Sequence, residues 1–128
     1  MGLLPVGNFQ YTGVSAPVVQ NGKVTGYLDH YIADRKFPVD MACMCVNINF
    51  WLRVGAPLMK CSFVAHMETL FLEDMKISMD EIEPKAQNAT NILVWHTQTV
   101  KQTALKEFVR YKNISDSNMP ALLKQVVF

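Results

Sequence analysis

Four polar residues stand where functional sites are often built, and their side chains could do chemistry. Arg35 lies in an irregular stretch and Asp40 precedes an apolar run, while Glu68 falls early in a predicted helix and His96 ends a predicted strand. Glu68 lies on an otherwise apolar side of its helix, where a carboxylate is unexpected. A carboxylate held there could take a proton from a reacting hydroxyl as a general base.

Each of these residues also has a structural explanation. Asp40 is suited to cap a helix, because its carboxylate accepts hydrogen bonds from the free N–H groups of the first turn. A loop arginine such as Arg35 is commonly solvated, and a histidine at a strand end, as His96 is, is commonly a surface residue. A structural role is open for Glu68 too, so the residues by themselves name no substrate.

The first part of the chain is predicted to form a hairpin and an irregular connection. Val14–Gln20 and Lys23–Tyr27 flank Asn21-Gly22, which is a strong signal for a tight β-turn. An irregular stretch over 29–37 follows, and Pro38 favours extended backbone at the residue before it.

Two helices are predicted in the middle of the chain. One begins after Asp40, covers 41–54 and ends at Gly55 and Pro57. Its polar residues do not gather on one face, so this helix should be buried. The second helix covers 65–76, with apolar residues at helical spacing at Phe71, Leu72 and Met75.

The remaining elements are shorter or less regular. Ser78-Met79-Asp80-Glu81 matches a capping box that opens a helical turn. The contiguous apolar residues within 91–96 predict a buried strand. The segment from residue 97 to 128 is more polar and should be weakly helical and partly extended.

Composition sets further limits. A chain of 128 residues and 14.5 kDa fits one domain, and an apolar fraction of 50% is enough for a packed core. The net charge of +1 argues against nucleic-acid binding, which usually needs a concentrated basic face. A charged fraction of only 18% suggests that part of the surface faces a partner. We find neither a secretory signal nor an apolar run long enough to span a membrane.

The three cysteines, at 43, 45 and 61, are too few for a disulfide framework. Cys43 and Cys45 would point to different sides of a helix, so a zinc site that includes His66 is not expected. Buried structural thiols are the expected state, and no metal ligand is assigned in this chain.

Four blocks of residues, in this order and spacing, resemble the C-terminal half of the β1,3-glucuronosyltransferases of the proteoglycan linkage region and a related carbohydrate epitope. The blocks are RKFPVDMA (35–42), HMET (66–69), EPKA (83–86) and ILVWHT (92–97). Pro5-Val6-Gly7 and the predicted hairpin continue the resemblance, which covers roughly residues 5–106.

The resemblance implies an α/β fold with a mixed sheet and flanking helices, as in the C-terminal half of a nucleotide-diphospho-sugar transferase of the GT-A-like type. Residues 1–128 would form a single partial domain, the acceptor-binding half, with the donor-binding half absent. The implied reaction is inverting transfer of glucuronate from UDP-glucuronate to the 3-hydroxyl of a terminal galactose. Manganese, the implied cofactor, would stabilise the departing diphosphate.

The resemblance also implies roles for single residues. Glu68 matches the general base, and Arg35 and Asp40 match residues of the acceptor site. Tyr31 stands where the family has a tryptophan that stacks on the acceptor sugar. His96 matches a ligand of the UDP phosphates.

This sequence departs from the family pattern in the acceptor and phosphate regions. Ser15 replaces a glutamate that contacts the acceptor, and Val64 and Gln98 replace arginines near the phosphates. The Asp-rich manganese motif lies upstream of the matched segment in the family. These departures predict weak binding of UDP-glucuronate. The alternative to an active enzyme is an inactive truncated or divergent paralogue that binds a sugar or a partner protein.

The resemblance implies a setting as well. The family acts on the luminal side of the Golgi membrane and forms homodimers through its C-terminal half. The sequons at Asn88 and Asn113 agree with glycosylation in that compartment.

Overall fold

The structure is a computed structural model that describes residues 1–8, 12–60, 66–97 and 114–126. The strands are β1 (Gly2–Leu3), β2 (Val6–Asn8), β3 (Val14–Gln20), β4 (Lys23–Leu28), β5 (Met44–Cys45), β6 (Glu83–Pro84) and β7 (Val94–His96). The helices are α1 (Ile48–Arg53), α2 (Met67–Asp74), α3 (Lys85–Ala89) and α4 (Met119–Val126), with 3₁₀ turns at Met41–Cys43 and Met79–Glu81.

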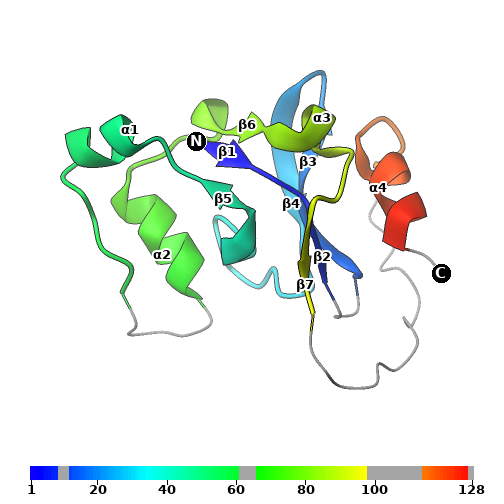
Figure 1. Cartoon of the computed structure of the whole chain (residues 1–128), viewed down its shortest axis with the longest axis horizontal. Helices are drawn as coiled ribbons and strands as arrows, with labels where there is room; N and C mark the ends of the chain where they lie inside the picture. The colour runs from blue at the N-terminus through cyan, green and yellow to red at the C-terminus, as the bar shows by residue number, and fades with distance from the viewer. Residues whose placement is uncertain (9–11, 61–65, 98–113, 127–128) are drawn as a thin grey trace.

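The strands form two mixed sheets, which confirms the α/β class. In the larger sheet the order is β4-β3-β2-β7, with β2 antiparallel to β3 and parallel to β7. In the smaller sheet β1 lies between β5, which is antiparallel to it, and β6, which is parallel. Figure 1 shows α1 and α2 at one end of the molecule and α4 at the other, with the β3–β4 hairpin between them.

The predicted hairpin is confirmed. Asn21 and Gly22 connect its strands with φ values of 51° and 74°, as a tight turn with two left-handed positions requires. A bulge follows, because Val18 pairs with Gly26 while Val19 pairs with Val24. The extra residue, Thr25, lets Val24 and Tyr27 pack into the same core despite their odd spacing.

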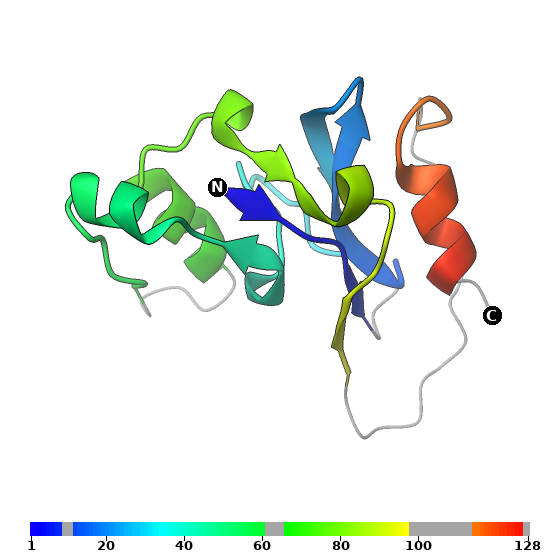
Figure 2. The same ribbon diagram turned by 45° about the horizontal axis from the view of Figure 1, so that its top comes forward.

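Each face of the hairpin packs on a different core. On one face, α4 packs against β3 and β4 through residues that are spaced to lie on one side of the helix. This core consists of Val14, Ala16, Leu28, Met119, Leu122 and Val126. The other face packs on α2 and the smaller sheet, in a core of Leu3, Val6, Val19, Val24, Phe37, Val39, Cys43, Leu72, Met75, Ile77, Ile82 and Ala89. Figure 2 shows α4 beside the hairpin, on the side away from α2.

The prediction of a buried helix over 41–54 is wrong in extent and in burial. Asp40 does cap a helical turn, but that turn ends at Cys43, and Met44 and Cys45 then pair with β1 as strand β5. A new helix, α1, begins after Asn47, whose side chain accepts from the N–H of Phe50. None of its residues is fully buried: Ile48 and Leu52 are exposed, whereas Phe50 and Trp51 are partly buried and pack against the core.

Two predictions beyond residue 60 are confirmed. Helix α2 lies within the predicted range 65–76 and buries Leu72, with Met75 buried directly after it. The capping box also forms, because the Ser78 N–H and hydroxyl both donate to the Glu81 carboxylate at 3.0 Å. These bonds, the backbone one first, hold the pKa of Glu81 below its ordinary value.

The predicted strand over 91–96 is shorter and more exposed than expected. Only Val94–His96 is a strand, and it pairs on one side with β2 at the end of the sheet. Leu93 and Trp95 are exposed, because an end strand is covered less than a central one. Beyond it, α4 confirms helix within 97–128, while residues 98–113 lie outside the described residues. No helix of the described ranges is long and apolar enough to cross a membrane.

Asn118, the residue directly before α4, holds a left-handed turn in place. Residues 86–89 of α3 have φ values of 54° to 57°, which is costly backbone for residues other than glycine. The Asn118 amide donates to the carbonyls of Ala89 at 2.7 Å and Pro17 at 3.0 Å, and its oxygen accepts from the N–H of Val19 at 2.8 Å. Asn118 therefore joins the turn, the hairpin and the start of α4.

We expect Asn118→Ala to lower the free energy of unfolding by about 2–4 kcal/mol, because it leaves three backbone groups without their partner. Denaturant unfolding measures the change. Asn49→Ala at an exposed position of α1 is the control, with an expected change within about 0.5 kcal/mol. Equal effects of the two variants would contradict the role given to Asn118.

Candidate functional site

The guanidinium of Arg35 lies at the centre of the candidate site, with a side chain that is only 6% exposed. Its Nη1 donates to the carbonyl of Tyr31 and its Nη2 to that of Val39, both at 3.1 Å. Its Nε donates to the hydroxyl of Thr69 on α2 at 3.2 Å. The alternative interpretation of Arg35 as a solvated loop residue is therefore wrong: the connection between β4 and the turn at Met41 folds around this side chain.

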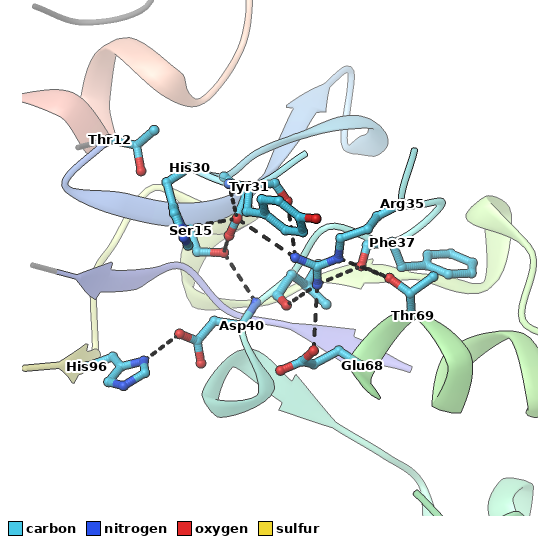
Figure 3. Close-up of polar contacts among 12 residues, drawn as sticks. Thr12, Ser15, His30, Tyr31, Arg35, Phe37, Asp40, Glu68, Thr69 and His96 are labelled. Carbon is cyan, nitrogen blue, oxygen red and sulfur yellow. Dashed lines mark hydrogen bonds and ion pairs between the residues drawn. The ribbon is translucent and has the colours of Figure 1, made fainter. Parts of the chain in front are cut away.

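Two carboxylates flank the guanidinium. Glu68 Oε2 lies 3.6 Å from Arg35 Nη2, and Asp29 Oδ1 lies 4.0 Å from Nη1. The side chain of Glu68 is 18% exposed, whereas that of Asp29 is buried. Glu68 is thus the carboxylate of this group that keeps contact with solvent, and it projects from the first turn of α2 (Figure 3).

An aromatic ring lies beside this group. Tyr31 is 41% exposed, and the Cζ of Arg35 is 6.0 Å from the centre of its ring. The ring of His66 meets it edge to face, with centroids 6.2 Å apart and an interplanar angle of 73°. The backbone N–H of Tyr31 donates to Asp29 Oδ1 at 2.8 Å, which fixes the chain that carries the ring.

Asp40 and His96 form a second group. His96 Nδ1 lies 2.7 Å from Asp40 Oδ2, and the other carboxylate oxygen of Asp40 accepts from the N–H of Ala42 at 2.9 Å. Asp40 therefore caps a helical turn, as its structural interpretation expects, and it also contacts His96, a second predicted site residue. Its role in the acceptor site stays a prediction. The side chain of His96 is 52% exposed.

In the structure, the residues that the sequence prediction named lie in two contacting groups. Arg35 contacts Glu68 and Tyr31, and Asp40 contacts His96, as Figure 3 shows. Val64, Gln98 and Asn113 lie outside the described residues.

Sequence reasoning missed three residues of the site: Asp29, His66 and Thr69. The signal for Asp29 was its position directly after the second strand of the hairpin, where a polar side chain can face the neighbouring loop. His66 and Thr69 stand on either side of Glu68 in one of the blocks already singled out.

The cysteines differ in burial, and Cys61 lies outside the described residues. Cys43 is buried as expected, and its pKa is raised by burial and then by the nearby negative charges, Asp40 first. Cys45 is exposed, contrary to expectation, because it lies in an end strand of the smaller sheet. Burial also raises the pKa of Tyr27. The described residues contain no group of three His, Cys, Asp or Glu side chains that could hold a metal ion.

The family of the chain follows from comparison with known proteins. The model of glycosyltransferase family 43 matches residues 1–100, and these contain every residue of the site described above. The chain therefore belongs to glycosyltransferase family 43.

Relatives with assigned names are similar over most of the chain. Galactosylgalactosylxylosylprotein 3-beta-glucuronosyltransferase S of Drosophila melanogaster is 40% identical over 94% of this chain, which is 30% of the relative. Its P counterpart from the same organism is 39% identical over 93% of this chain and 25% of its own length. Galactosylgalactosylxylosylprotein 3-beta-glucuronosyltransferase 2 of Homo sapiens is 37% identical over 80% of this chain and 32% of its own length. The chain thus spans a third or less of each of these relatives.

Replacing the central guanidinium by an amine tests how far the site depends on it. We expect Arg35→Lys to lower the free energy of unfolding by about 2–4 kcal/mol, since an ammonium group cannot reach carbonyls at 31 and 39 and a hydroxyl at 69 together. Denaturant unfolding measures this change. Arg53→Lys on the exposed end of α1 is the control, with a change within about 0.5 kcal/mol. A similar small loss at Arg35 would show that its buried bonds contribute little.

The position of His96 depends on a close approach between β7 and β2. A Cβ atom on Gly7 would lie 2.3 Å from the Trp95 ring, and Gly7 and Trp95 are paired in register. We expect Gly7→Ala to cost about 1–3 kcal/mol of unfolding free energy, and less in a Trp95→Ala background where the clash is gone. A Cβ at Gly26 would meet nothing within 4 Å, so Gly26→Ala is the control. An equal cost in both backgrounds would exclude the ring contact as the cause.

Proposed function

We propose that this chain forms the acceptor side of a glucuronosyltransferase that transfers glucuronate from UDP-glucuronate to the 3-hydroxyl of a terminal galactose, with inversion. One observation carries the proposal: Glu68, a partly exposed carboxylate, is held by a buried guanidinium beside the exposed ring of Tyr31. Membership of glycosyltransferase family 43, and relatives named as 3-beta-glucuronosyltransferases, support this choice of reaction.

Glu68 is the general base of the proposed reaction. Its carboxylate takes the proton of the galactose 3-hydroxyl as that oxygen forms a bond to the anomeric carbon of glucuronate. The bond from the anomeric carbon to the phosphate oxygen breaks on the opposite side, and UDP leaves with the bonding electrons. Arg35 directs the carboxylate through the ion pair, because its guanidinium is itself fixed by the loop carbonyls.

The acceptor sugar would lie on Tyr31, whose exposed ring offers an apolar face for stacking. Asp40 would accept from a sugar hydroxyl, since each carboxylate oxygen has a second lone pair beyond the bonds to His96 and Ala42. Arg35 belongs to the proposed acceptor site because it contacts both Tyr31 and Glu68. His96, half-exposed at the end of β7, is the residue proposed to face the UDP phosphates.

Manganese, which the family resemblance implies, has no fitting group of ligands among the described residues. We therefore assign no metal ligand to them, and no step of the proposal passes through the metal. The described residues would correspond to the acceptor-binding half of a GT-A-like fold. The proposed protein acts on the luminal side of the Golgi membrane and forms homodimers. It is glycosylated at Asn88, which is exposed in the left-handed turn.

The decisive substitution is Glu68→Gln, which keeps the shape of the side chain and removes the base. We expect transfer of labelled glucuronate to a galactosyl-galactose acceptor, in this chain or a longer form of it, to fall about 10²–10⁴-fold. Binding of the acceptor, measured by calorimetry, should change by less than about threefold. Glu73→Gln, at an exposed position of the same helix, is the control and should keep full activity.

Other outcomes would change the assignment. Transfer that survives Glu68→Gln would remove the general base. Binding of the galactose disaccharide with neither UDP binding nor transfer, in any form of the chain, would replace the enzymatic proposal with that of a sugar-binding module.

A further inference from the structure

The two groups of the candidate site meet at one buried hydroxyl. The hydroxyl of Ser15 on β3 donates to Asp29 Oδ2 at 2.5 Å and accepts from the backbone N–H of Asp40 at 3.2 Å. Asp29 belongs to the group around Arg35, and Asp40 to the pair with His96. We propose that Ser15 is a positioning residue that couples these two groups; its role in sugar binding rests on the proposed function.

Burial and the sheet limit what Ser15 can do. It is only 1% exposed, so its side chain points inward and does not reach a bound sugar. The family resemblance places an acceptor-binding glutamate at this position, and the serine does not replace that contact. Its backbone is fixed by pairing with Val6 in the middle of the larger sheet, so the hydroxyl is anchored to a rigid element.

The bonds made by Ser15 act on both groups at once. Its bond to Asp29 is charge-assisted, and Asp29 in turn accepts from the N–H of Tyr31 and faces Arg35. Its bond from the Asp40 N–H fixes the backbone from which the carboxylate reaches His96. A shift of the Ser15 hydroxyl therefore displaces the proposed sugar platform and the proposed phosphate ligand together.

Thr12 provides a matched control for a loss of stability alone. It is buried near the start of the same strand, and its hydroxyl donates to the carbonyl of Val14 at 2.9 Å. Figure 3 shows its side chain apart from the contacts around Arg35 and Asp40. Thr12→Ala removes a buried hydrogen bond that belongs to neither group of the site, whereas Ser15→Ala removes the two bonds that join the groups.

The first measurement needs no ligand. Amide hydrogen exchange, followed by NMR, reports the N–H groups of Tyr31 and Asp40, which contact opposite ends of the Ser15–Asp29 unit. We expect Ser15→Ala to raise both exchange rates at least about tenfold, Thr12→Ala to leave them within about threefold, and Ser15→Thr to restore them. An unchanged rate at Tyr31 in Ser15→Ala would overturn the coupling.

The second measurement tests the role in binding. We expect Ser15→Ala to weaken binding of a galactosyl-galactose disaccharide about tenfold, with Ser15→Thr and Thr12→Ala within about threefold of the wild type. Equal weakening by Ser15→Ala and Thr12→Ala would reduce Ser15 to a general stabilising residue and overturn the proposal. If the wild-type chain does not bind the disaccharide, the proposed function fails, while the exchange rates still decide whether Ser15 couples the two groups.

Discussion

The burial of one positive charge, the guanidinium of Arg35, organises the loop and the site together. A charge removed from water is costly unless it is paired and hydrogen-bonded, and Arg35 meets this condition through two loop carbonyls, a helix hydroxyl and two carboxylates. The connection from Asp29 to Asp40 contains no regular element that could fix its path. Its backbone carbonyls are held by the same side chain that directs Glu68, so the shape of the loop and the geometry of the site have one cause.

This arrangement explains why the two flanking carboxylates differ. Asp29 is buried and bound by Ser15 and the N–H of Tyr31, so it serves to hold the structure. Glu68 stands at the start of α2 with part of its surface in solvent, and it forms an ion pair with Arg35. A group that must take a proton from a substrate needs that access. The same cation therefore supports a buried carboxylate with a structural role and a partly exposed one, which is the proposed general base.

Local signals in the sequence predicted local structure well. The Asn21-Gly22 turn, the Ser78–Glu81 capping box and the apolar side of α2 are each set by residues a few positions apart. The range 41–54 was predicted wrongly because Met44 and Cys45 serve as the partner of β1, and no local pattern reveals a partner more than 40 residues away. For the same reason the sequence indicated Arg35 as a site residue through family resemblance but could not reveal its burial or its neighbour Asp29.

The relation of His96 to Asp40 depends on contacts that are even further apart in the sequence. Parallel pairing of β7 with β2 brings together residues 88 positions apart, such as Val6 and Val94. Only the absence of a side chain at Gly7 lets the Trp95 ring lie over that strand. The approach to β7 is fixed by α4, because Gln125 accepts from the N–H of Ile92 and donates to the carbonyl of Thr90. The family match ends at residue 100, yet α4 at 119–126 supplies this contact and covers one face of the hairpin. A segment beyond the matched region thus helps to place a residue within it, which is why the site has to be understood from the whole fold rather than from the matched blocks alone.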